Sequence, residues 1–151
     1  MANLWAAVCD AMASEQDRVL THEAIRLMRD AGGVNKTGGP FGAVIARDGL
    51  LVSAAGNSVV KDLDPSAHAE VTAIRSARNK LGTWDLSDCV MNTSCECCPM
   101  CCATADWAWI RTVFDAAAWL DCSDLFCDPG INEDMQHAKH KCEIKLTQIF
   151  S

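Results

Sequence analysis

Hydrophobic residues recur along the first half of the chain in a pattern that predicts a helix followed by a hairpin. Residues 15–31 carry apolar side chains at three- and four-residue intervals, typical of an amphipathic helix, and two glycines end the pattern. The apolar runs 41–46 and 50–55 flank Asp48-Gly49, a pair that favours a tight turn between antiparallel strands. We therefore predict a β-hairpin after the first long helix.

Helices and strands alternate in the segment that follows the hairpin. A second helical stripe is opened by the Asp-Pro-Ser sequence at 64–66 and closed by Gly82. Beyond it, the pattern predicts a buried strand over 88–94, a helix over 99–109 and a strand over 111–117.

The periodicity weakens after residue 119, where we expect a helix near 132–141 and a strand near 143–150. A hairpin followed by alternating helices and strands predicts a mixed sheet covered by helices, which is a layered α/β domain. The 151 residues suit one domain, because a chain of this size buries roughly 70% of its unfolded surface.

Charge and hydropathy narrow the choice of partners. The net charge of −7 repels phosphate backbones, so no nucleic-acid partner is expected. No apolar run approaches the roughly 18 residues that a membrane helix needs. The first apolar stretch, residues 4–13, is interrupted by Asp10 and lacks a basic start, so it does not resemble a signal peptide. We expect a soluble, cytoplasmic protein.

The ten cysteines are unevenly distributed along the chain. Half of them lie within eight residues, namely Cys95, Cys97, Cys98, Cys101 and Cys102. Disulfide frameworks join distant loops, whereas a tight cluster suits metal binding or redox chemistry. We expect metal binding for the cluster, and free, buried thiols for the scattered cysteines.

A histidine and two cysteines form a candidate metal site at the start of two predicted helices. His68 lies near the start of the second long helix, and Cys98 and Cys101 open the next one. One imidazole and two thiolates are a three-ligand zinc set that leaves the fourth position open for water. Glu70, two positions after His68, can reach that water only in the irregular first turn, because residues i and i+2 do not share a helix face.

His-x-Glu followed by Cys-x-x-Cys is the signature of zinc-dependent nucleobase deaminases. Over Gly38 to Trp107 the chain resembles the guanine deaminase branch of the cytidine deaminase-like superfamily. The stretches that carry the resemblance are GGPFGAVIARDG, GNSVVKDLDPSAHAEVTAIR, LGTWDLSDC and SCECCPMC. Relatives usually carry proline where this chain has Cys97, and small or aliphatic residues where it has Cys102, so two extra thiols adjoin the site.

The resemblance implies a single catalytic domain over residues 1–151, a three-layer α/β/α sandwich with a mixed sheet of about five strands. It implies one zinc ion per chain, held by His68, Cys98 and Cys101, with Glu70 as the catalytic acid and base. The implied reaction is hydrolysis of a small-molecule nucleobase, guanine, to xanthine and ammonia.

Four further residues are candidates for substrate binding by resemblance. Asn57 matches an asparagine that hydrogen-bonds the base; the alternative is a turn residue after a strand. Phe41 can line the pocket or belong to the core, and Trp107 matches a tryptophan that shapes the pocket. Asp128 matches a purine-reading aspartate only if a one-residue gap is allowed.

Several alternatives stay open on the sequence. The substrate can be cytosine, a guanosine-type nucleoside, a pterin, a triazine or a tRNA adenosine, although the acidic charge disfavours tRNA. Cys95 or Cys97 can replace one of the two zinc-binding cysteines. A non-catalytic zinc module or a redox dithiol protein explains the cysteines, but neither accounts for Glu70 beside His68.

The end of the chain carries a prediction about assembly. Residues 144–151 alternate apolar and polar residues, and exposed Leu146, Ile149 and Phe150 would need to bury against something. We expect a homodimer in which the tail from about Glu143 packs on the partner; the alternative is a tail folded onto its own sheet.

Overall fold

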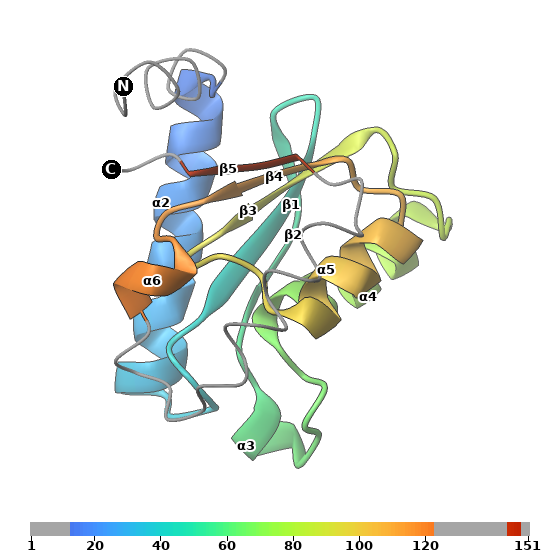
Figure 1. Ribbon diagram of the computed structural model, residues 1–151. Helices are drawn as coiled ribbons and strands as arrows, with labels where there is room; N and C mark the ends of the chain where they lie inside the picture. The colour runs from blue at the N-terminus through green and yellow to red at the C-terminus, as the bar shows by residue number, and fades with distance from the viewer. Residues whose placement is uncertain (1–12, 123–144, 149–151) are drawn as a thin grey trace.

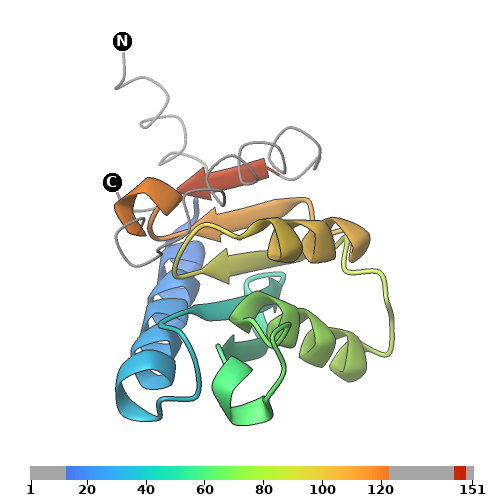
Figure 2. The ribbon, with the colours of Figure 1, turned by 60° about the horizontal axis from the view of Figure 1, so that its bottom comes forward.

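The computed structural model describes residues 13–122 and 145–148 and places them in three layers (Figure 1). A five-stranded sheet of order β2-β1-β3-β4-β5 forms the middle layer. Helix α2 covers one face, and helices α4 and α5 cover the other (Figure 2). The predicted three-layer sandwich with a mixed sheet is therefore confirmed. Asp128 and the helix expected near 132–141 lie outside the described residues.

The hairpin forms where the sequence predicts it. Strands β1 (Gly42–Arg47) and β2 (Leu50–Gly56) pair antiparallel. Asp48 and Gly49 between them have φ values of 51° and 73°, the left-handed conformation at both positions that a tight hairpin turn requires.

The other strands extend the sheet from β1. Strand β3 (Cys89–Thr93) pairs antiparallel with β1, and β4 (Thr112–Asp115) pairs parallel with β3. Strand β5 (Lys145–Gln148) pairs parallel with β4 of the same chain. This segment therefore takes the arrangement of a tail folded onto its own sheet.

Helix α2 (Glu15–Arg29) begins as the pattern predicts but ends differently. The two glycines do not end it, because the chain continues as a π-helical turn, η1 (Asp30–Val34). A Cβ on Gly32 would lie 2.8 Å from the Cβ of Pro40, so glycine allows η1 to contact the loop before β1 closely.

The second long helix starts later than expected. The segment 64–66 forms a turn in which the Asp64 carboxylate accepts hydrogen bonds from both the backbone and the hydroxyl of Ser66. Because this turn competes with the helix, α4 (Ala69–Leu81) begins only after His68. Gly82, with φ of 66°, ends α4 as predicted.

Three other helices complete the described chain. Helix α5 (Pro99–Trp107) agrees with its prediction within two residues. The short helices α3 (Val59–Asp62) and α6 (Trp119–Cys122) were not expected from the pattern, because four residues are too few to show a helical period.

Two hydrophobic clusters lie on opposite faces of the sheet. The larger one joins the sheet to α4 and α5 and includes Ile45, Ile74 and Met91, while the smaller joins the sheet to α2 through Leu20 and Val44. None of the helices within the described ranges combines the length and apolarity needed to span a bilayer.

Candidate active site

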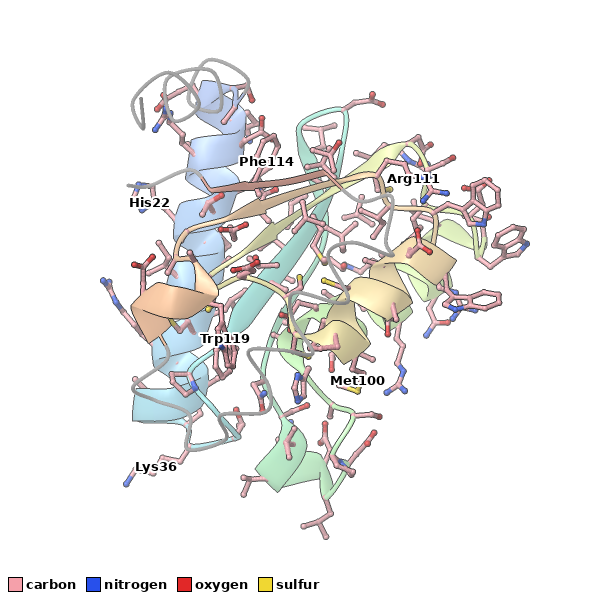
Figure 3. The ribbon with its side chains drawn as sticks, viewed as in Figure 1. His22, Lys36, Met100, Arg111, Phe114 and Trp119 are labelled. Atoms are coloured by element: carbon pink, nitrogen blue, oxygen red, sulfur yellow. The ribbon has the colours of Figure 1, made fainter. Side chains whose placement is uncertain are left out.

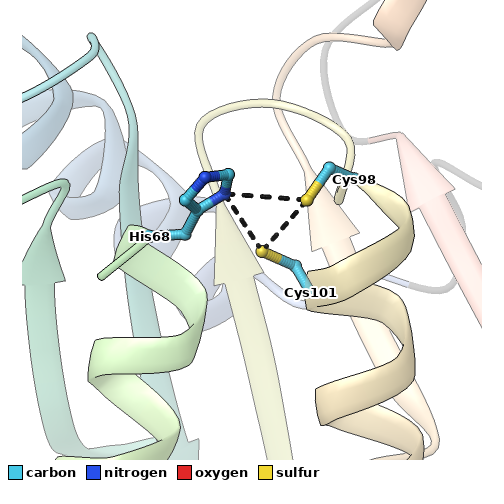
Figure 4. Close-up of side chains that lie close together, drawn as sticks. All are labelled: His68, Cys98 and Cys101. Carbon is cyan, nitrogen blue, oxygen red and sulfur yellow. Dashed lines mark hydrogen bonds between the residues drawn. The ribbon is translucent and has the colours of Figure 1, made fainter. Parts of the chain in front are cut away.

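The three predicted metal ligands come together where α4 and α5 begin. His68 is the N-cap residue of α4 and Cys98 that of α5, and both have extended backbone angles. The Nδ1 atom of His68 lies 3.6 Å from the Sγ atoms of both Cys98 and Cys101, and the two sulfurs are 3.5 Å apart (Figure 4). Within the described residues, this is the group of side chains whose donor atoms converge closely enough to hold a metal ion.

The separations fit zinc. With Zn–S distances of about 2.3 Å and a Zn–N distance of about 2.0–2.1 Å, tetrahedral coordination requires S···S near 3.8 Å and N···S near 3.6 Å. The observed triangle agrees within about 0.3 Å. Because three protein groups converge and no fourth joins them among the described residues, the set leaves one coordination position for water or substrate.

The protonation of Cys98 and Cys101 also favours the binding of a cation. A hydrogen bond from the Cys101 thiol, with a further one from His68, lowers the pKa of Cys98 to about 4 despite partial burial. The pKa of Cys101 is raised in turn, first by its hydrogen bond with Cys98 and then by burial. The hydrogen bond to Cys98 raises the pKa of His68. The two cysteines thus share one proton that a metal ion would displace.

Glu70 lies beside the ligands with its side chain in the protein interior. It occupies the first turn of α4 and is 6% exposed. Burial raises its pKa above the ordinary value, while a hydrogen bond with the Cys101 thiol acts in the opposite direction. The carboxylate is therefore within contact of the ligand set, and its elevated pKa suits a group that accepts and returns protons.

Asn57 is held next to the histidine ligand by the backbone. It follows β2 and is 4% exposed. Its own N–H donates to the carbonyl of Phe41 (2.9 Å), and the next residue, Ser58, donates to the carbonyl of Ala67 (3.0 Å). The side-chain oxygen accepts from the N–H of Val59 (3.2 Å), an arrangement that fixes the orientation of the amide.

The loop before β1 encloses the Asn57 side chain. The hydroxyl of Thr37 donates to the Asn57 carbonyl (2.7 Å). A Cβ on Gly38 would lie 1.9 Å from the Asn57 side-chain oxygen, so only glycine fits there. The close approach of Gly38 to Asn57 was not predicted from the sequence.

The remaining substrate-binding candidates differ in where they lie. Phe41 is half-buried and packs against the larger hydrophobic cluster, so it adjoins both the core and the Asn57 loop. Trp107 is the last residue of α5 and is 82% exposed, about 13 Å along the helix from Cys98. Trp107 therefore lies at the opposite end of α5 from Cys98.

The three other cysteines of the cluster are buried in the core next to Cys98 and Cys101 in the sequence. Cys95, Cys97 and Cys102 are all buried, and Cys102 donates to the carbonyl of Cys97. A hydrogen bond with Cys102, and then burial, raises the pKa of Cys97 well above the ordinary value. All six cysteines with described side chains are free thiols. Cys95 and Cys97 do not join the ligand group.

Comparison with known proteins places these features in a family. The zinc-binding region of the cytidine and deoxycytidylate deaminases matches residues 14–116, which include both ligand segments. Guanine deaminase of Bacillus subtilis (strain 168) is 44% identical over 119 residues, 78% of this chain and 76% of that protein. The X-ray structure of guanine deaminase from Bacillus subtilis covers 75% of this chain and 71% of its own, with 42% identity and a TM-score of 0.71.

Two further relatives show how specific the likeness is. The structure of a guanine deaminase from Nitrosomonas europaea covers 99% of this chain and 87% of its own at 25% identity, with a TM-score of 0.71. A tRNA-specific adenosine deaminase of Aquifex aeolicus (strain VF5) is also 44% identical, but over 62 residues, 41% of each chain. The chain belongs to the zinc-dependent cytidine and deoxycytidylate deaminase family, in its guanine deaminase branch.

Proposed function

We propose that this protein is a zinc-dependent guanine deaminase that hydrolyses guanine to xanthine and ammonia. The observation that carries the proposal is the triangle of His68, Cys98 and Cys101 with the buried Glu70 in contact with it. The long match to a guanine deaminase supports the choice of substrate.

Each residue of the site has a chemical role in this reaction. His68, Cys98 and Cys101 would hold the zinc ion, which would supply a bound water with a pKa lowered from about 15.7 toward 7. Glu70 accepts a proton from the attacking water and returns it to the amine that leaves C2 of the ring as ammonia. Its burial keeps bulk water from competing for that proton.

Recognition of the base falls to residues around the ligands. The Asn57 side-chain oxygen is occupied by the Val59 N–H, so its NH₂ group is directed to hydrogen-bond an acceptor on the purine. Phe41, half-buried beside it, offers an aromatic surface to the ring. Asp128 is proposed, from the resemblance, as the acceptor for purine N–H groups.

Charge and extent of similarity favour guanine over a tRNA adenosine. The net charge of −7 opposes binding of a polyanion. Identity to the guanine deaminase extends over 119 residues, compared with 62 for the tRNA-specific adenosine deaminase.

An ammonia-release screen tests the substrate. Purified protein is assayed against guanine, guanosine, cytosine, adenine, a pterin and a triazine, with the Glu70→Gln variant as a blank for contaminating deaminases. We expect guanine to give the highest kcat/KM. Zinc-loaded protein that releases ammonia from another of these compounds, and not from guanine, would contradict the proposal.

We also propose that the enzyme is a cytoplasmic homodimer. The free thiols of the described cysteines suit a reducing compartment. Trp107, 82% exposed, is a large apolar surface that a second subunit can cover. A second chain beside Trp107 would also explain why the resemblance assigns this residue to the pocket.

Subunit mixing tests whether tails are exchanged in the dimer. One chain carries Glu70→Gln with an intact tail, and the other keeps Glu70 but lacks residues 149–151, a truncation that leaves β5 whole. If the tail closes the partner's pocket, each chain alone is inactive and the refolded mixture regains activity, because one complete site forms. A mixture as inactive as its components would place the tail on its own subunit.

A further inference from the structure

The loop that carries the first cysteine ligand is attached to the rest of the protein at more than one point. It runs from the end of β3 at Thr93 to Cys98, where α5 begins. At its start, Ser94 donates its backbone N–H to the carbonyl of Gly42, and its hydroxyl accepts the Gly42 N–H, both at 3.0 Å. These bonds fix the loop to β1, but they lie four residues before the ligand.

Closer to the ligand, Glu96 provides a second attachment. Its backbone N–H donates to the carbonyl of Ala117 (2.9 Å), and its carboxylate accepts the backbone N–H of Trp119 (2.8 Å). Both partners lie between the end of β4 and the start of α6. Glu96 therefore connects the ligand loop to a segment that is distant in sequence and on the other side of β3 from β1.

The environment of Glu96 makes this attachment rigid. Glu96 is 7% exposed and its neighbours Cys95 and Cys97 are 4% and 1% exposed, so the loop is enclosed on both sides of the residue. Trp119, the first residue of α6, is also buried (8% exposed; Figure 3). A buried carboxylate must keep its hydrogen-bond donors, because the loss of one leaves a desolvated charge unsatisfied.

We infer that Glu96 is a positioning residue for the zinc site, whose buried carboxylate fixes the loop before Cys98 by accepting the Trp119 N–H. Glu96 does not reach the ligand group itself, so it acts on the metal through the backbone. The inference rests on the proposed assignment of Cys98 as a zinc ligand. Groups that orient metal ligands affect metal affinity about 10- to 100-fold when they are changed.

The test compares zinc release from four proteins: wild type, Glu96→Ala, Glu96→Gln and Asp121→Ala. Asp121 is the matched control, because its carboxylate also accepts a backbone N–H at the start of α6, that of Ala118 (3.0 Å), but Asp121 is exposed whereas Glu96 is buried. Zinc transfer to a colorimetric chelator gives the release rate without an activity assay, and kcat and KM for guanine are measured separately.

Glu96→Ala should release zinc at least about tenfold faster than wild type and lose kcat more than KM changes. Glu96→Gln should stay within about threefold of wild type, because the amide oxygen can still accept the Trp119 N–H. Asp121→Ala should lose thermal stability without faster release. Equal release from Glu96→Ala and wild type would overturn the inference, as would an equal acceleration in Asp121→Ala.

Two further outcomes keep the result interpretable. If Glu96→Ala does not fold, Glu96→Asp replaces it, since a carboxylate shorter by one methylene cannot reach the Trp119 N–H. Faster release from Glu96→Asp than from Glu96→Gln supports the inference, and equal rates overturn it. Wild-type protein that binds no zinc would overturn the proposed function, whereas zinc-bound wild type with an unaffected Glu96→Ala overturns this inference alone.

Discussion

The two faces of the sheet are covered by helices that begin in different ways. Helix α2 starts with a capping box, in which Ser14 accepts the N–H of Asp17 (3.1 Å) and Asp17 accepts the N–H of Ser14 (2.9 Å). Helices α4 and α5 start at His68 and Cys98, and neither side chain makes a capping hydrogen bond. The same position in a helix thus stabilises the fold on one face and presents ligands on the other.

This difference shows that α4 and α5 lack the side-chain capping bonds that stabilise the start of α2. Ser, Thr, Asp and Asn are the residues that satisfy the free N–H groups of a helix start, and replacing them costs about 0.5–2 kcal/mol. His68 and Cys98 make no such capping bond, and their donor atoms instead lie 3.6 Å apart. The α4–α5 face should therefore depend on zinc for stability, whereas the α2 face should not.

Removal of zinc should have the largest effect, and it should destabilise the α4–α5 face of the sheet but not the α2 face. A chelator is expected to abolish deamination and to lower stability by about 4 kcal/mol, if free zinc was 1,000 times its Kd. Hydrogen exchange should speed up in the first turns of α4 and α5 while α2 keeps its protection. Added zinc should restore both properties.

The matched control for zinc removal is the Cys98→Ala protein, which lacks one ligand. Its melting temperature should not respond to the chelator, because the zinc site is already incomplete. Exchange that speeds up equally in α2 and α4 on chelation would refute the idea that only one face relies on the metal.

Glu70→Gln should reduce turnover by at least roughly 10²-fold, because the amide cannot accept the proton of the attacking water. Zinc content should stay near one ion per chain, since Glu70 is not part of the ligand group. Asp17→Asn makes the same carboxylate-to-amide change on the other face and should leave kcat unaltered. Near-normal turnover in Glu70→Gln would mean that another group is the base.

Gly38→Ala should weaken guanine binding by about tenfold in KM, which is the loss of one hydrogen bond to the base. The new methyl group would lie 1.9 Å from the Asn57 side-chain oxygen and must displace it. Gly33→Ala is the control, because nothing lies within 4 Å of the added Cβ. Both variants are measured by steady-state kinetics on guanine. Equal KM values would show that Gly38 has no role in binding the base.

The sequence predicts the ligand set better than its surroundings. His68, Cys98 and Cys101 could be proposed as one set because zinc prefers histidine and cysteine ligands, whose spacing is visible as a motif, and the structure brings their donor atoms together. The Gly38–Asn57 contact and the Glu96–Trp119 hydrogen bond join residues 19 and 23 positions apart. Such contacts form only when distant loops come together in the folded protein, so they cannot be predicted from hydrophobic periodicity or motif spacing.

The same reasoning explains which fold predictions needed correction. The hairpin, α5 and the end of α4 follow local rules, because Asp48-Gly49, a proline in the first helical turn and Gly82 each act on their own neighbours. The start of α4 was placed too early because the Asp64 side chain hydrogen-bonds Ser66 instead of capping a helix. The π-turn after α2 continues the helix through both glycines, and Gly32 lies where an added Cβ would be only 2.8 Å from the Cβ of Pro40.

Ser14→Ala should have the smallest effect and should test the comparison most directly. Loss of the capping oxygen leaves the Asp17 N–H without its partner and should lower the free energy of unfolding by about 1 kcal/mol. For a domain of this size, that corresponds to a fall of about 2–4 °C in melting temperature. Zinc release and the KM for guanine should not change, because α2 contacts the opposite face of the sheet from the ligands.

Ser14→Thr keeps the oxygen and should restore most of the lost stability. If Ser14→Ala instead speeds zinc release as strongly as it lowers the melting temperature, the two faces are coupled through the sheet, and the division between a stabilising face and a ligand-bearing face fails.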